Sequence, residues 1–208
     1  MTRTDIINHL IEVKGYQKYL EIGVQYPESN FLKVNAEYKV GVEPYPVGDW
    51  QERGILQKTS DNFFELIPSD ETFDIVFIDG LHTREQCLAD ILNSLNHLSE
   101  DGCILVHDCL PTEEYQTTIE DNGREWTGDV WKSIVDIKKR DGLEVYTIDT
   151  DWGVGFIRRN PNCIGESPDR ELDFETYIAF RKQLLNVKSV EEWKNLQLEF
   201  QQFGNHKE

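Results

Sequence analysis

The segment from residue 73 to residue 79 constrains the fold more than any other, because it is almost wholly apolar and ends in an aspartate. A strand of this composition is buried on both faces, which is typical of a parallel sheet covered by helices on both sides. Apolar extended runs alternate with amphipathic helical runs along most of the chain, and this alternation predicts repeated strand–helix units. We therefore expect an α/β fold built on a parallel sheet.

The expected elements can be placed from apolar periodicity and from glycine and proline positions. Strands are expected at 19–23, 39–43, 54–58, 73–79, 103–107, 143–148 and 153–158. Helices are expected near the N-terminus around residues 6–11, and at 28–36, 81–98, 130–140, 173–185 and 190–203. The last two strands are close enough in sequence to be antiparallel neighbours at a sheet edge.

These elements predict a Rossmann-like, seven-stranded, mostly parallel sheet with one antiparallel edge strand and helices on both faces. Residues 1–160 are expected to form this domain. Residues 161–208 are expected to form a C-terminal helical extension packed on the same domain. Trp193, Phe200 and Phe203 in the extension suggest a surface for a homo-oligomer.

Charge and composition exclude several classes of partner. The chain has 21 Lys and Arg against 39 Asp and Glu, a net charge of −18 that repels nucleic-acid backbones and anionic membranes. No run approaches the ~18 apolar residues of a membrane span, and the opening residues lack an apolar signal core. The four cysteines form no CxxC pair, which indicates a reduced chain. We expect a cytoplasmic protein that binds neither nucleic acid nor membrane.

Polar residues stand where the expected strands end. In an open parallel sheet, ligands bind beyond the carboxyl ends of the strands, where the strand order reverses. Five expected strands deliver polar groups or glycine to this rim: Glu21 and Gly23, Glu43, Ser60 and Asp61, Asp79, and His107 with Asp108. This coincidence indicates a ligand site more strongly than any one motif.

Gly23 and Glu43 narrow the kind of ligand. Gly23 permits a tight turn and close approach to the backbone, and Glu43, 20 residues later, stands where nucleotide-binding units bind ribose hydroxyls. The alternative for Glu43 is an exposed carboxylate before a proline turn. The segment after Gly23 lacks the G-x-G-x-x-G pattern that a dinucleotide requires, and Glu21 would repel pyrophosphate. The pattern favours a nucleoside that carries positive charge.

Four ordered motifs carry a family resemblance: LEIGV at 20–24, GVEP at 41–44, FDIVFIDGLH at 73–82 and DGCILVHD at 101–108. Together they resemble the class I S-adenosylmethionine-dependent methyltransferases, and within these a small bacterial subfamily with IDG-x-H and HD strand ends. The resemblance covers roughly residues 15–158, with one departure: Pro27 stands where many members have another glycine, so the first loop is altered.

The resemblance also implies roles for residues at the expected rim. Glu21 and Gly23 would contact the methionine part of the cofactor and Glu43 the ribose. Ser60 and Asp61 would contact the adenine, Asp79 would lie near the methyl group, and Gly80 joins the cofactor-binding set.

Three residues are candidates for the chemistry. Methyl transfer from a sulfonium is an in-line displacement that needs positioning and, for a hydroxyl acceptor, removal of a proton. His82, His107 and Asp108 could remove it, although His82 could instead begin a helix and His107 pack at a strand end. Similarity to catechol- and sugar-type O-methyltransferases implies a divalent metal at Asp79, His107 and Asp108. A histidine there suits a more borderline metal than magnesium.

Two further stretches are expected near the acceptor. Residues 111–124 are polar and predict an active-site loop or lid. The tryptophans at 126, 131 and 152 either wall an acceptor pocket or belong to the core, and Thr127 or Asp129 is expected to cap the next helix.

The sequence therefore predicts an S-adenosylmethionine-dependent methyltransferase that acts on oxygen of a small molecule or sugar. Two alternatives remain open. One is a catalytically weak methyltransferase-like binding or partner protein, which Pro27 favours. The other is a metal-dependent hydrolase built on His82, His107 and Asp108, against which the position of Glu43 argues.

Overall fold

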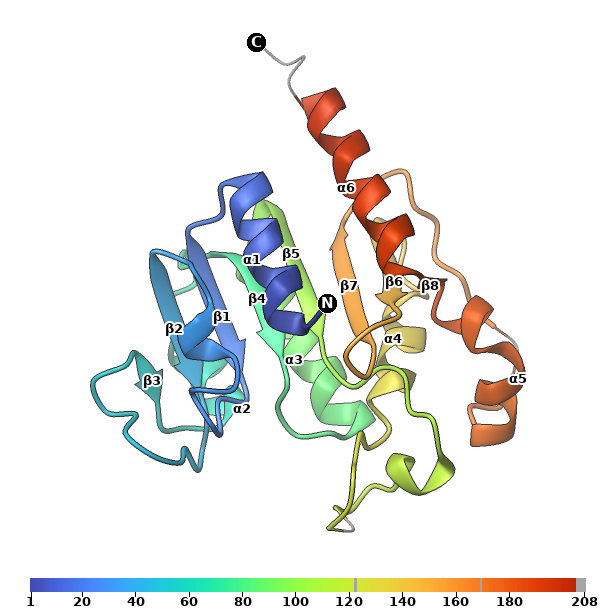
Figure 1. Ribbon diagram of the computed structural model, residues 1–208, viewed down its shortest axis with the longest axis horizontal. Coiled ribbons are helices and arrows are strands. Elements are labelled where there is room, and N and C mark those ends of the chain that lie inside the picture. The colour runs from blue at the N-terminus through green and yellow to red at the C-terminus, as the bar shows by residue number, and fades with distance from the viewer. Residues whose placement is uncertain (122, 169, 205–208) are drawn as a thin grey trace.

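The computed structural model describes residues 1–121, 123–168 and 170–204, with side chains as far as residue 197. These residues form an eight-stranded sheet with the strand order β3-β2-β1-β4-β5-β7-β6-β8 (Figure 1). The strands are β1 (Lys18–Ile22), β2 (Tyr38–Val42), β3 (Ile55–Leu56), β4 (Phe73–Ile78), β5 (Leu98–Val106), β6 (Leu143–Ile148), β7 (Val154–Arg159) and β8 (Val187–Lys188).

The predicted α/β class and mostly parallel sheet are confirmed, but the prediction for the antiparallel strand is wrong in one respect. β7 runs antiparallel to both β5 and β6 and lies between them, so it is not an edge strand. Its first four residues are all buried, which suits an interior position. The edge strand on this side of the sheet is β8, which pairs parallel with β6. It has only two residues, so no sequence pattern indicated it.

Helices occur at most of the predicted positions. They are α1 (Arg3–Lys14), α2 (Ser60–Leu66), α3 (Arg84–Asn96), α4 (Val130–Ile137), α5 (Phe174–Leu184) and α6 (Val190–Gly204), with 3-10 turns η1 (Phe31–Lys33) and η2 (Glu114–Thr117). Thr2 caps α1 in a reciprocal capping box with Asp5, and Gly15 ends the helix in the left-handed conformation.

The helix predicted at 28–36 does not form, and only the turn η1 lies there. The cause is a tertiary contact of Asn30, which is buried in a non-helical conformation. Its amide donates to Glu21 and Tyr19, and its carbonyl oxygen accepts from Thr4 of α1. Periodicity along the sequence cannot reveal such a contact.

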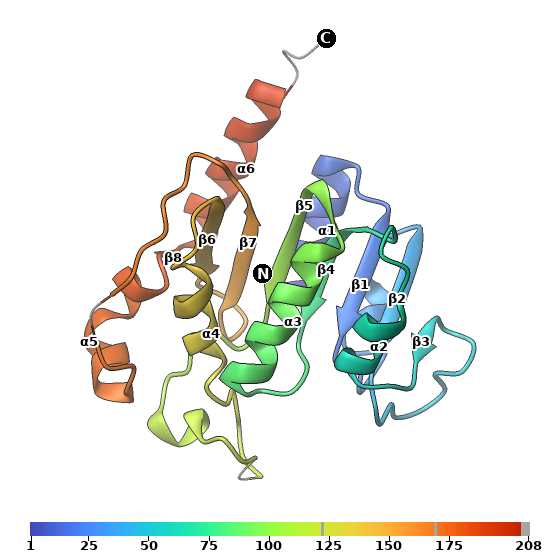
Figure 2. The ribbon, with the colours of Figure 1, turned by 180° about the vertical axis from the view of Figure 1, so that it is seen from behind.

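Helices cover both faces of the sheet. One face packs alternate residues of β1, β4 and β5 against α2, α3, α4 and α5, and the opposite face packs the intervening residues against α1 and Trp193 of α6. Figure 1 shows α1 and α6 on one side of the sheet, and Figure 2 shows α2, α3 and α4 on the other. This double cover explains why β4 is apolar almost throughout.

The pairing register of β1, β2, β4 and β5 brings the carboxyl ends of these strands to one level. Ile22 pairs with Val42 of β2 and with Ile78 of β4, and Ile78 pairs with Val106 of β5. The next residue of each strand, namely Gly23, Glu43, Asp79 and His107, therefore stands on the same rim. The rim spans the β1–β4 junction, where the strand order reverses.

The C-terminal segment contributes to the same core. Tyr177 and Leu184 of α5 join the cluster on one face, and the Tyr177 hydroxyl donates to the carbonyl oxygen of Pro111 at 2.9 Å. Trp193 is fully buried, so it does not form an exposed oligomer surface, whereas the side chains of Phe200 and Phe203 lie outside the described residues. Among the described helices, none has the length and apolar character needed to cross a membrane.

Candidate functional site

A cavity of about 390 Å³ lies beyond the ends of β1, β2 and β4. Five residues predicted to bind the cofactor line it together: Gly23, Glu43, Ser60, Asp61 and Gly80. The structure therefore brings together segments that are up to 57 positions apart along the chain. Tyr45 and Gln86 also line the cavity and were not singled out from the sequence, because neither belongs to a recognisable motif.

Gly23 is required by close approach of two backbones. Its φ is +95°, and a Cβ at this position would lie 1.9 Å from the carbonyl oxygen of Asp79. The Gly23 N–H donates to Val42, while the Asp79 N–H donates to Ile22. Only glycine allows the end of β1 to turn against the end of β4 in this way.

Glu43 is held inward at the end of β2. It is 8% exposed, so the alternative of an exposed carboxylate before a proline turn is wrong. Its Oε1 accepts the Tyr45 backbone N–H at 2.9 Å. Burial raises the pKa of Glu43, and the Tyr45 hydrogen bond opposes that rise. The carboxylate is thus fixed on the cavity wall with hydrogen-bonding capacity left for a ligand.

Ser60 and Asp61 occupy the first turn of α2, which begins after the Thr59 N-cap. The Gln86 side chain of α3 donates to Asp61 Oδ1 at 3.0 Å and lies 3.3 Å from Ser60 Oγ. It also donates to Asp90 Oδ1 at 3.1 Å, so Gln86 ties this side of the cavity to α3.

Glu21 does not line this cavity. It is 3% exposed, accepts a hydrogen bond from the Tyr19 hydroxyl, and accepts the Asn30 amide at 3.0 Å. Burial raises the pKa of Glu21 to about 8. Its carboxyl is therefore held by Tyr19 and Asn30, and it is not part of the cavity wall that Gly23 and Glu43 form.

A second cavity, of about 320 Å³, gathers the residues predicted for chemistry. Its lining is Arg3, Asp79, His82, His107, Asp108, Glu125, Trp126, Thr127 and Trp152. His82 Nε2 lies 3.3 Å from Asp79 Oδ1, and His82 Nδ1 lies 3.4 Å from Asp108 Oδ2. His107 Nδ1 lies 3.1 Å from Asp108 Oδ1 and 3.4 Å from Asp79 Oδ1. Two imidazoles and two carboxylates thus converge at the ends of β4 and β5.

Charge within this cluster is tightly coupled. Burial raises the pKa of Asp79, but His107 and His82 outweigh that effect and bring it well below its usual range. Burial lowers the pKa of His82, and Asp79 and Asp108 raise it further than burial lowers it. Burial lowers the pKa of His107, but Asp79, Asp108 and Asp151 outweigh that effect and bring it well above its usual range.

Arg3 restricts His107 in a way the sequence did not indicate. Arg3 Nη1 lies 2.7 Å from His107 Nε2. A guanidinium only donates hydrogen bonds, so a hydrogen bond between these two atoms requires a lone pair on Nε2.

Backbone strain is concentrated at this cavity. Among the described non-glycine residues, four have positive φ, and three of them are Asp108 at 61°, Asp151 at 48° and Trp152 at 66°. Asp108 and Trp152 line the cavity, and Asp151 lies 3.8 Å from His107 Nε2. Residues in this region of conformational space are costly and often mark functional sites.

The loop before α4 closes one side of the second cavity. The Trp126 ring stacks on His82, with centroids 4.8 Å apart, and Gly128 approaches so closely that a Cβ would lie 1.7 Å from the His82 carbonyl oxygen. Trp131 belongs to the core, whereas Trp126 and Trp152 line the cavity.

The prediction that Thr127 or Asp129 caps α4 is confirmed for the position of Asp129, but not for a side-chain cap bond. Asp129 occupies the N-cap position of α4 without a side-chain cap bond. Its carboxylate instead accepts the Arg84 backbone N–H of α3 at 2.7 Å. The Thr127 hydroxyl donates to Gln116, which anchors the loop to η2.

One group of residues has the spacing of a cation site. Asp79, His82 and Asp108 each offer a ligand atom, and these atoms lie within 4.8 Å of one another. The predicted set contained His107 in place of His82. His107 Nδ1 nonetheless lies 3.4 Å from Asp79 Oδ1 and 3.1 Å from Asp108 Oδ1.

The short segment that follows β4 joins the two cavities. Gly80 and Leu81 line the first cavity, and Asp79 and His82 line the second. A ligand in the first cavity therefore lies directly beside the clustered acids and histidines of the second.

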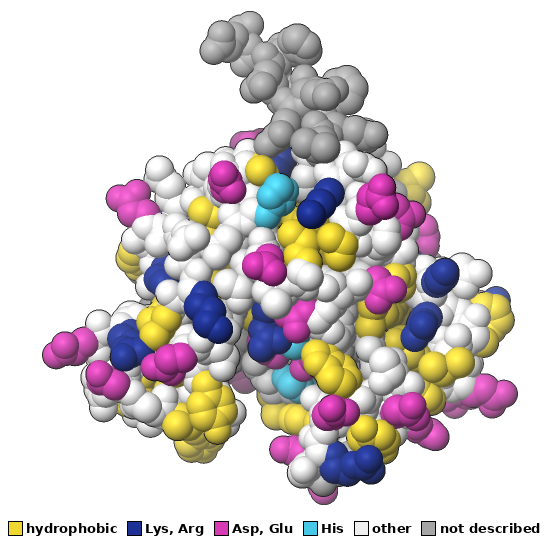
Figure 3. All heavy atoms as spheres, viewed as in Figure 1, with side chains coloured by type: hydrophobic (Ala, Val, Ile, Leu, Met, Phe, Trp, Pro, Cys, Tyr) yellow, Lys and Arg dark blue, Asp and Glu magenta, His cyan; other side chains and the backbone are white. Residues whose placement is uncertain are grey.

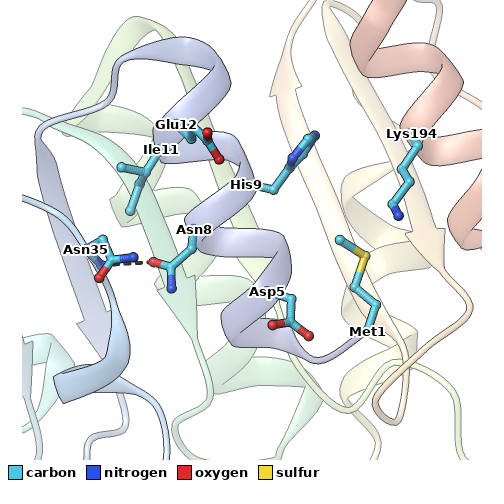
Figure 4. Close-up of a pocket in the computed structure, with 8 residues that line it drawn as sticks. All are labelled: Met1, Asp5, Asn8, His9, Ile11, Glu12, Asn35 and Lys194. Carbon is cyan, nitrogen blue, oxygen red and sulfur yellow. Dashed lines mark hydrogen bonds between the residues drawn. The ribbon is translucent and has the colours of Figure 1, made fainter.

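A third hollow lies away from the strand ends. It has a volume of about 680 Å³ and is formed mainly by α1 residues, with Asn35 and Lys194 at its sides (Figure 4). Asn8 accepts the Asn35 backbone N–H there at 2.8 Å. It contains none of the predicted site residues. On the face drawn in Figure 3, basic side chains of the described residues stand among acidic ones and do not form a continuous basic patch.

Residues 34–109 match the protein-family model described as a methyltransferase domain. No curated protein matches the chain.

Solved structures share its fold. A methyltransferase from Podospora anserina, solved with S-adenosylhomocysteine bound, is 16% identical, covers 76% of this chain and 78% of its own, and gives a TM-score of 0.57. An O-methyltransferase from Bacillus cereus in complex with S-adenosylhomocysteine is 16% identical over 76% and 80%, with a TM-score of 0.54. An O-methyltransferase from Streptomyces achromogenes involved in tomaymycin synthesis is 14% identical over 76% and 79%, with a TM-score of 0.53. The chain thus matches a methyltransferase domain over residues 34–109 and shares the fold of these solved methyltransferases.

Proposed function

We propose that this protein transfers a methyl group from S-adenosylmethionine to a hydroxyl of a small molecule. The proposal rests on the observation that the segment after β4 lines both cavities. Gly80 lines the first cavity, and Asp79 lines the second. A donor in the first cavity and an acceptor in the second would meet across this segment. That proximity is the main requirement of an in-line transfer.

The residues around the first cavity fit the cofactor. Gly23 would leave room for the methionine part, and Glu43 would accept hydrogen bonds from the ribose hydroxyls. Ser60 and Asp61 would face the adenine. Glu21 would be less available to bind the cofactor, because its carboxyl already accepts hydrogen bonds from Tyr19 and Asn30.

The cofactor supplies an electrophilic methyl group on a sulfonium. In the transfer, the bond from sulfur to the methyl carbon breaks and its electrons remain on sulfur, while the acceptor oxygen bonds to the methyl carbon. The acceptor proton must go to a base of this chain. His82, His107 and Asp108 all lie at the second cavity, and His82 is the most exposed of the three, with 17% of its side chain accessible.

A divalent metal is a further part of the proposal. Asp79, His82 and Asp108 would hold it, which leaves His107 as the candidate base, and it would polarise the acceptor hydroxyl so that the proton is lost more easily. Two carboxylates with one imidazole suit manganese, iron, cobalt or zinc better than magnesium, which prefers oxygen ligands only. Titration with these ions, with Asp108→Asn as the reference variant, tests this part separately.

The acceptor is expected to be uncharged where it meets the cavity. Asp79, Asp108 and Glu125 line the cavity against the single arginine Arg3. The similar proteins described as O-methyltransferases support oxygen as the accepting atom. Trp126 and Trp152 offer flat surfaces for a sugar ring or an aromatic ring.

Two alternative functions predict different results in binding and turnover experiments. A binding or partner protein without efficient transfer would bind the cofactor but turn over no acceptor. A metal-dependent hydrolase would bind metal without affinity for S-adenosylmethionine. The division into a domain at 1–160 and an extension at 161–208 also remains a proposal, as does a homo-oligomer.

The deciding experiment is calorimetric titration of the full chain with S-adenosylmethionine and with S-adenosylhomocysteine. Methyl transfer to a panel of hydroxylated acceptors is then followed by the release of S-adenosylhomocysteine. Binding together with turnover supports the proposal. Absence of binding would reject it, and binding without turnover across the panel would favour the partner protein.

A further inference from the structure

The wall of the first cavity that α2 and α3 form is held together by one side-chain amide. Gln86 Nε2 of α3 donates to Asp61 Oδ1 at 3.0 Å and to Asp90 Oδ1 at 3.1 Å. Asp61 and Gln86 line the cavity, whereas Asp90 does not line it and is only 1% exposed. The two hydrogens of the amide are therefore both taken up by carboxylates.

These two carboxylates fix the direction in which the amide faces. An ionised carboxylate only accepts hydrogen bonds, so a Gln86 amide turned over would set its own oxygen against Asp61 and Asp90. Burial raises the pKa of Asp90 to about 6, and hydrogen bonds from Ser60 and Gln86 oppose that rise, so the carboxyl is charged at mildly alkaline pH. In this orientation neither Gln86 Oε1 nor Asp61 Oδ2 accepts a hydrogen bond from any of the described residues.

We propose that Gln86 is a specificity-determining residue that accepts a hydrogen bond from the exocyclic amino group of the cofactor base through Oε1, beside Asp61 Oδ2. This inference rests on the proposed binding of S-adenosylmethionine in the first cavity. Adenine carries a 6-amino group with two hydrogens, which matches the two free oxygens. A base with a 6-oxo group would set a third oxygen against them and leave all three unpaired once water is excluded.

The remaining wall of the cavity supports this placement of the base. Glu43 would take the ribose and Gly23 would leave room for the methionine part, so the base is left for the wall that carries Gln86. A glutamine free to turn presents its oxygen or its nitrogen and would accept either kind of base. Asp90 removes that choice, because water cannot reach this buried carboxylate in place of the amide. Asp90 thus acts as a positioning residue that lines neither cavity.

The test compares S-adenosylhomocysteine with S-inosylhomocysteine, which has nearly the same shape but carries a 6-oxo group. Each is titrated calorimetrically into the full chain at mildly alkaline pH. We expect the wild type to bind the inosine compound ~30-fold or more weakly than the adenosine compound, because two acceptors would face its oxygen. Gln86→Met removes Oε1 with little change in size, and it should reduce this preference by ~5-fold or more.

Gln57→Met is the matched control. Gln57 Nε2 donates to the carbonyl oxygen of Pro44, which lines the cavity, but Gln57 itself does not line it. The preference should therefore stay unchanged in this variant. If Gln86→Met fails to fold because Asp90 loses its donor, the double variant with Asp90→Asn removes the buried charge and gives the same comparison, with Asp90→Asn alone as its reference.

A smaller preference in the wild type, a smaller fall in Gln86→Met, or an equal fall in Gln57→Met would overturn the role of Gln86 and leave the proposed function standing. Binding of neither compound by the folded wild type would reject the proposed function and this inference with it.

Discussion

Replacement of Glu43 by glutamine should weaken the binding of S-adenosylmethionine. Glu43 lies on the wall of the first cavity, and its Oε1 already accepts the Tyr45 backbone N–H. Glutamine keeps an oxygen for that bond and has nearly the same shape, so the turn after β2 should be retained. What changes is the charge of the acceptor that would face the ribose hydroxyls.

The magnitude follows from the strength of hydrogen bonds to a charged group. Loss of such bonds costs ~1–3 kcal/mol, which corresponds to roughly 5- to 150-fold in the dissociation constant. Glutamine still offers one oxygen, so the loss should fall in the lower half of this range, and Glu43→Ala should fall in the upper half. The assay is calorimetric titration of each variant with S-adenosylmethionine, with circular dichroism to confirm folding.

Glu12→Gln provides the matched control. Glu12 lines the hollow on α1 and lines neither of the two cavities at the strand ends (Figure 4). Its replacement should not alter cofactor affinity. If both Glu43 variants fold and bind the cofactor within twofold of the wild type, the assignment of Glu43 to the ribose is refuted.

Three further predictions concern other parts of the site. Gly23→Ala should abolish cofactor binding and lower the melting temperature, because its Cβ would lie 1.9 Å from a backbone oxygen, whereas Gly48→Ala, with similar φ but open space around it, should lower it much less. His82→Gln and His107→Gln should each slow methyl transfer by ~10²-fold or more while cofactor affinity stays within twofold; full turnover in both would remove them from the chemistry. Asp90→Asn should stabilise the protein by roughly 1–3 kcal/mol above pH ~6 and little below pH ~4, because burial raises the Asp90 pKa to about 6 and stability is lost as pH rises through that value. Urea midpoints measured at low and at mildly alkaline pH would show this difference, and equal shifts at both would contradict it.

The residues on the rim of the sheet could be predicted because each one follows from the sequence of its own strand. An apolar run identifies a buried strand, the next polar residue marks its end, and parallel pairing brings these ends to one level. Gly23, Glu43, Asp79 and His107 follow this rule. None of these inferences needed a contact between distant side chains.

The elements that were missed depend on such contacts. The segment after Pro27 has enough apolar residues for a helix, but buried Asn30 is bound to Glu21 and Tyr19, which favours a non-helical path. Asp129 precedes a helix in sequence, yet its carboxylate caps a different helix through Arg84. In both cases a polar side chain forms its hydrogen bonds with residues of another helix or strand.

Arg3 is the clearest case of information absent from the local sequence. It stands in the first turn of an amphipathic helix, where a basic residue has no favourable interaction with the helix dipole. Its placement makes sense only once the 149–153 turn presents Asp151 and the end of β5 presents His107. Because the α1 cap at Thr2 and the strained turn both act on this one arginine, the geometry of the second cavity depends on the first residues of the chain. Shortening the chain by those residues should therefore slow methyl transfer while leaving the first cavity able to bind S-adenosylmethionine, since none of the residues that line it lies before Ile22.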